Sequence, residues 1–89
     1  MAHHPGTVEG WNGSLHELAM AIGNMRYDTQ ADFIQLLTEE FERQSRADHD
    51  SGRNQLSARL DHVAAHLDWA RVDLMMAWRI CEPFMEDTT

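Results

Sequence analysis

Apolar residues in the last third of the chain recur at alternating steps of four and three, which is the spacing of a helix stripe. One stripe contains Leu56, Leu60, Val63, Leu67, Ala70, Leu74, Ala77 and Cys81. A second stripe contains Ala58, His62, Ala65, Trp69, Val72, Met76 and Ile80. At about 100° per residue, the two stripes lie on roughly opposite sides of one helix. A helix with two apolar sides needs two neighbours.

The pattern predicts an all-α fold with helices over residues 14–27, 29–47 and 53–82. Ser14 followed by Glu17 is the signature of a capping box at the start of the first helix. The polar residues 48–52, which end in Gly52, are typical of a turn. Pro83 ends the third helix, because proline cannot continue a regular helix.

Folding the chain at the turn brings apolar positions of the two arms together. It pairs Phe41 with Leu60, Leu37 with Val63, and Phe33 with Leu67. We therefore expect a long antiparallel helical hairpin whose first arm is kinked near residue 28. The domain organisation follows: an irregular tail over residues 1–13, one helical domain over 14–85, and a C-terminal tail over 86–89.

The hairpin uses the first stripe and leaves the second one without a neighbour. If Trp69, Val72, Met76 and Ile80 stay exposed to water, roughly 6–12 kcal/mol of stabilisation is lost, at about 1.5–3 kcal/mol for each large apolar residue. A second copy would cover them in a dimeric four-helix bundle, whereas a first helix that folds back would give a three-helix monomer. We favour the dimer, because Ala58 and Ala65 permit close helix approach and the stripe of the first helix is too short. A hetero-partner is the third alternative.

The bulk composition narrows the function classes. The chain has 89 residues and a formal net charge of −8, from fifteen acidic and seven basic residues. This charge disfavours nucleic acid and anionic membranes as partners. The single cysteine, Cys81, favours a reducing compartment. Residues 1–13 contain no apolar run typical of a signal peptide, so we expect a cytoplasmic protein.

Two side-chain pairs are candidates for metal chemistry. His62 and His66 are four residues apart, a spacing used for metal ligands on helices. They are weak candidates, because neither an HExxH nor an ExxH motif accompanies them. Glu39 and Glu42 form one ExxE half of the carboxylate motif with which helical bundles hold magnesium for nucleotide hydrolysis, but no ExxD half follows. We therefore assign no catalytic residue and no cofactor.

The sequence favours a small acidic protein–protein interaction or assembly module over an enzyme. The predicted dimer interface is the second stripe, and a further docking surface comprises Trp78, Phe84 and Met85 at the end of the third helix. A metal-binding or nucleotide-hydrolysing bundle that uses the histidine or glutamate pairs is one alternative. An acidic decoy or inhibitor of a basic protein is another, although arginines interrupt its carboxylate track.

Overall fold

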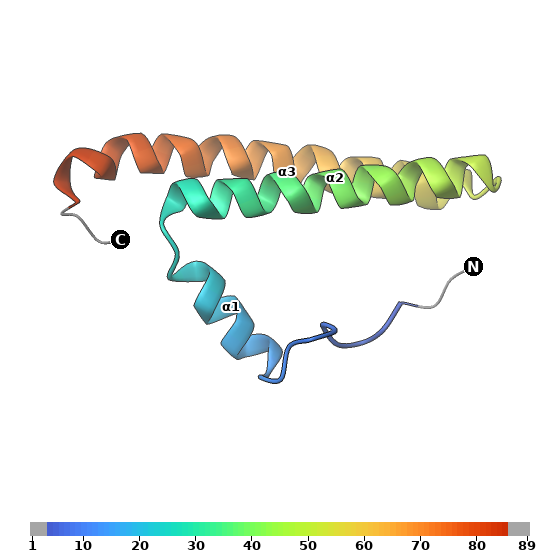
Figure 1. The fold of residues 1–89 in the computed structure, drawn as a ribbon. Helices are drawn as coiled ribbons and strands as arrows, with labels where there is room; N and C mark the ends of the chain where they lie inside the picture. The colour runs from blue at the N-terminus through green and yellow to red at the C-terminus, as the bar shows by residue number, and fades with distance from the viewer. Residues whose placement is uncertain (1–3, 86–89) are drawn as a thin grey trace.

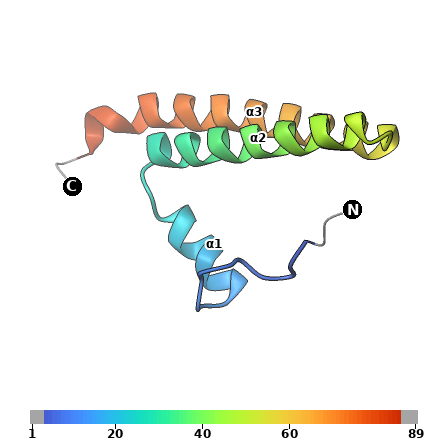
Figure 2. The ribbon, with the colours of Figure 1, turned by 45° about the vertical axis from the view of Figure 1, so that its right-hand side comes forward.

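The computed structural model describes residues 4–85, and every regular element in that range is helical. The elements are α1 (Leu15–Gly23), α2 (Tyr27–Asp50), α3 (Asn54–Cys81) and a short 3₁₀ turn, η1 (Glu82–Phe84). The long helices α2 and α3 lie side by side in opposite directions (Figures 1 and 2). The all-helical prediction is confirmed. The predicted C-terminal tail, residues 86–89, lies outside the described residues, as do residues 1–3.

A tight turn joins α2 to α3 and lies slightly later than predicted. α2 continues to Asp50, and Gly52 adopts the left-handed backbone conformation with φ of 82°. Only glycine reaches this conformation without strain, which explains its place just after the helix end. The backbone N–H and the Nε of Arg53 both donate to Asp48, each at 2.8 Å, to the carbonyl and carboxylate oxygens respectively. These bonds reverse the chain direction.

The predicted capping box opens α1. The Ser14 hydroxyl accepts from the Glu17 N–H at 3.0 Å, and the Glu17 carboxylate accepts from the Ser14 N–H at 2.9 Å. Trp11 adds a third contact, because its indole N–H donates to the Ser14 carbonyl oxygen at 2.9 Å. Trp11 therefore docks onto the start of its own first helix.

The far end of α1 is held by one side chain of α2. The Gln30 amide Nε2 lies 3.0, 2.8 and 3.0 Å from the carbonyl oxygens of Ile22, Gly23 and Met25. These carbonyls belong to the last turn of α1 and the residues just after it, where intrahelical partners run out. Gln30 thus ties the end of α1 to the start of α2.

The first arm breaks earlier than the predicted kink near residue 28. α1 ends at Gly23, because Gly23 and Asn24 both weaken a helix, and α2 begins only at Tyr27. From there α1 turns away from the hairpin and does not continue along α3 (Figures 1 and 2). The prediction that residues 14–27 form part of the first arm of the hairpin is therefore wrong, because the hairpin consists of α2 and α3 alone. The structure also differs from the three-helix alternative, since α1 leaves the second stripe uncovered.

The contact line between α2 and α3 consists of small side chains. The buried residues among those described are Ala31, Thr38 and Ser45 on α2 and Ser57 and Ala64 on α3. They repeat every seven residues on each helix, which keeps them on one side. The Ser45 hydroxyl lies 2.9 Å from the Ser57 hydroxyl, so the register differs from the predicted one by only one or two residues. Small residues let the two helices approach closely.

This close approach corrects the predicted role of part of the first stripe, whereas Leu60, Leu67 and Leu74 are half-buried beside the contact line. Leu56 and Val63 remain 37% exposed, and no large side chain within residues 4–85 is fully buried. The hairpin line lies one position further along α3, at Ser57 and Ala64. The displaced apolar residues form one side of the hairpin, which we call the leucine flank. It comprises Leu37 on α2 and Leu56, Val63 and Ala70 on α3.

Candidate interaction surface

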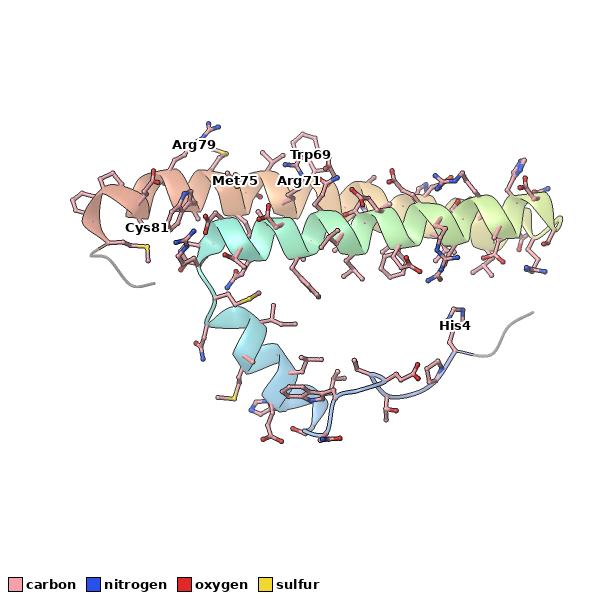
Figure 3. The ribbon with its side chains drawn as sticks, viewed as in Figure 1. His4, Trp69, Arg71, Met75, Arg79 and Cys81 are labelled. Carbon is pink, nitrogen blue, oxygen red and sulfur yellow. The ribbon has the colours of Figure 1, made fainter. Side chains whose placement is uncertain are left out.

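The second stripe of α3 is uncovered along its whole length. We call it the outer face of α3, and it comprises Ala58, His62, Ala65, Trp69, Val72, Met76 and Ile80. Trp69, Met76 and Ile80 have exposed fractions of 71%, 54% and 72%. Trp69 projects from the side of α3 that points away from α2 (Figure 3). Large apolar side chains gathered in this way mark an interaction site on a small domain.

The direction of the outer face follows from helix geometry. Ala64 is buried against α2, and Trp69 comes five residues later. Five residues rotate a helix by about 140°, so the outer face points almost directly away from α2. A helix seated there would lie in a row with α3 and α2, rather than closing a square bundle.

The N-terminal half of the outer face is indented, whereas the C-terminal half carries large side chains. A shallow hollow lies between Gln55, Ala58, Arg59 and His62, with Leu56 at its edge. These four positions have the spacing of the hole that receives one side chain of a facing helix in coiled-coil packing. The face therefore carries both large projections and a place to receive one.

The edge of α3 beside the outer face is polar. There, residues of α2 and α3 line a groove, namely Gln35, Thr38, Glu42, Asp61, Ala64, Ala65 and Asp68. The Asp61 carboxylate accepts from the buried Ser45 hydroxyl at 2.5 Å, and the Asp68 carboxylate accepts from Arg71 Nε at 3.0 Å. Two of the three carboxylates in the groove are thus already engaged within the hairpin.

The two candidate metal pairs are exposed and lie on different helices. His62 and His66 are on α3, and no group of three His, Cys, Asp or Glu side chains able to hold a metal ion occurs in residues 4–85. On α2, Glu39 accepts from the Gln35 amide at 2.9 Å, and Glu42 lines the polar groove. Each pair therefore stands without a third ligand in the described structure.

The predicted docking residues at the end of α3 have different surroundings. Trp78 is half-buried, and the Arg26 guanidinium lies 5.0 Å from its ring centre, in a cation–π contact. Phe84 in η1 is 85% exposed. Met85 has its sulfur 3.8 Å from the Cys81 sulfur. Trp78 thus joins the hairpin to the α1–α2 junction, whereas Phe84 remains free.

The sequence interpretation missed the leucine flank as an exposed surface. Its residues were assigned to the hairpin core, because large apolar side chains dominate a periodicity pattern. The signal that would have revealed it is the sevenfold repeat of small residues, as in Thr38 and Ser45 on α2 and Ser57 and Ala64 on α3. Such a repeat permits close helix packing, which pushes larger neighbours to the side.

Comparison with known proteins found no matching family model, no similar curated protein and no similar solved structure. Within residues 4–85, none of the helices combines the length and the apolarity that crossing a bilayer requires. The exposed surfaces of α2 and α3 are therefore the features from which we infer a function.

Proposed function

We propose that this chain is a small non-enzymatic assembly module that forms a homodimer through the outer face of α3. The observation that carries the proposal is the exposure of Trp69, Met76 and Ile80 on one side of one helix. A chain of this length buries only about 60% of its unfolded surface, so its own core is marginal. Self-association is a common way for such domains to gain stability.

The size of the outer face suits a moderate dimer. Two copies bring six large side chains together, which at about 1.5–3 kcal/mol each amounts to roughly 9–18 kcal/mol. Association costs about 4–15 kcal/mol in lost freedom, so the net affinity is modest. We expect the transition from monomer to dimer between about 1 μM and about 1 mM.

The arrangement differs from the compact bundle expected from the sequence. Because the outer face points away from α2, the dimer would place the helices in the order α2, α3, α3 and α2. This layer leaves the leucine flanks of both copies on the sides. The flank is the competing surface for self-association, and the test must separate the two.

Sedimentation equilibrium across this concentration range, with three glutamine variants, tests the proposal. Trp69→Gln removes the largest outer-face side chain, and we expect it to shift the transition to at least tenfold higher concentration. Leu36→Gln is the matched control, because Leu36 is 64% exposed on α2 and rotated about 140° from the buried Ala31. It should leave the dimer unchanged. Circular dichroism checks that each variant remains helical.

Val63→Gln reports on the leucine flank. A dimer that is weakened by Val63→Gln but not by Trp69→Gln would assign the interface to the flank and overturn the proposal. A wild-type chain that remains monomeric up to about 1 mM would overturn it as well. Dissociation by Trp69→Gln alone would support it.

A further inference from the structure

The outer face of α3 is unequal along its length. Its C-terminal half carries the projecting side chains Trp69, Met76 and Ile80, and its N-terminal half carries Ala58, His62 and Ala65. The hollow bounded by Gln55, Ala58, Arg59 and His62 lies in the N-terminal half. A projection at one end and a hollow at the other are complementary only when two copies run in opposite directions.

We propose that two copies pair antiparallel along α3, about a two-fold axis that crosses the outer face at the level of Leu67. This inference rests on the proposed dimer and defines the register of its two α3 helices. Met76 of each copy then enters the hollow at Ala58 of the other, nine residues on either side of the axis. Trp69 packs over Ala65 in the same register. Ile80 comes beside Asn54 at the start of the other α3. One alignment thus gives Met76 a hollow and Trp69 a small neighbour.

The charged residues beside the outer face agree with this register. Arg59 and Asp73 lie on the same edge of α3, both exposed, at nearly equal distances from the axis. Neither forms an ion pair within the described residues. The antiparallel pairing brings Arg59 of one copy beside Asp73 of the other, twice by symmetry. The Asp68 side chains of the two copies approach each other at the axis. The Arg71 Nε of the same chain lies 3.0 Å from each Asp68 carboxylate and offsets its charge.

The parallel pairing fits the same surface poorly. It would set Trp69 against Trp69 and Met76 against Met76, while Ala58 faced Ala58 across a gap. Large pairs crowd and small pairs leave voids, and both destabilise packing. The distribution of size along the outer face therefore favours the antiparallel direction.

The single cysteine provides a direct measurement of direction. Cys81 lies about 140° around α3 from Met76, so a spin label on its sulfur leaves the outer face free. Fourteen residues separate it from the axis. At 1.5 Å per residue, the antiparallel dimer places the two Cys81 positions about 42 Å apart along the helix. In the parallel dimer the two sites have no separation along the helix, and two labels would be within about 25 Å.

Pulsed electron spin resonance on the labelled wild-type chain distinguishes the two pairings. A distance near 42 Å supports the register, and a distance below about 25 Å overturns it while leaving the dimer itself intact. Absence of any distance between copies at about 1 mM overturns the proposed dimer instead. Circular dichroism of the labelled chain shows whether the label preserves the hairpin.

A charge exchange provides the second test. Arg59→Asp and Asp73→Arg should each weaken dimerisation about tenfold, because each places like charges together at two symmetric sites. The double variant should recover the wild-type affinity. Arg46→Asp is the matched control, since Arg46 is exposed on α2 and has no ion pair within the described residues. A double variant no better than the single ones would overturn the register.

Discussion

Enlarging the small-residue line between α2 and α3 is the sharpest test of how the hairpin is held together. Ala64 is only 4% exposed and lies in the groove shared with Thr38. Ala64→Leu adds three carbon atoms at a buried point of the contact line between the two helices. Overpacking of this kind costs about 1–3 kcal/mol, because side chains or backbones must move apart.

The expected loss of stability is large enough to measure. For a domain of this size, about 1 kcal/mol shifts the thermal midpoint by about 4–8 °C. Ala64→Leu should therefore lower the midpoint by at least about 4 °C in thermal unfolding followed by circular dichroism. All variants are compared at one protein concentration, because association would otherwise shift the midpoint by mass action.

Ala47→Leu is the control, because Ala47 is exposed on the same hairpin. It adds the same atoms in solvent and should change the stability by less than about 0.5 kcal/mol. The reasoning is refuted if Ala64→Leu is as stable as Ala47→Leu or more stable than the wild type. Such a result would mean that leucine–leucine contacts, and not the small residues, determine the distance between the helices.

Two further predictions concern polar contacts. Ser45→Ala should destabilise the hairpin by about 1–2 kcal/mol, because it leaves the buried Ser57 hydroxyl without its partner. Ser57→Ala should cost less, since the Ser45 hydroxyl keeps the Asp61 carboxylate as its acceptor. The double variant should cost less than the sum in urea unfolding, and strict additivity would show that the two hydroxyls act independently. The second prediction is that α1 becomes less stable in acid. The hydrogen bond from the Ser14 backbone N–H, and to a smaller extent the one with its hydroxyl, lowers the pKa of Glu17 below its usual value of 4.5. A lowered pKa stabilises α1 fully above pH 4.5, and this contribution disappears as the pH falls through the folded-state pKa. The protection of the α1 amides against hydrogen exchange, relative to an unfolded chain at the same pH, should fall in this range. Glu17→Gln should remove this fall, and a variant that keeps the wild-type fall would contradict the prediction.

The helix boundaries were accessible from the sequence, because local chemistry determines them. The Ser14–Glu17 pair, the turn at Gly52 and the stop at Pro83 act within a few residues of their position. The end of α1 was less accessible. Gly23 and Asn24 only weaken a helix, and the end at Gly23 is fixed in place by Gln30, which binds the carbonyl groups of the last turn. That contact joins two helices and has no periodic signature.

The facing surface of α3 was predicted one position away from the observed one. Periodicity assigned Leu56 and Val63 to the hairpin, whereas Ser57 and Ala64 occupy it. Both alternatives repeat every seven residues, and a count of large apolar residues cannot separate them. What decides is the distance at which two helices pack, which depends on the small residues of both. The exposure of the second stripe was easier to predict, since no other segment of the described chain packs against that side of α3.

The predicted dimer and the observed hairpin are linked by the same packing. Because small residues bring α2 and α3 close together, the hairpin buries little apolar surface of its own, and Ala31 and Ala64 are its only fully buried apolar residues among those described. A hairpin this thin cannot hide Trp69 or Ile80 behind a second layer. A further helix over an exposed apolar surface would add stability, and the outer face of α3 has both the exposed side chains and a hollow to receive one of them. Close packing inside the hairpin is therefore the physical reason to expect assembly outside it.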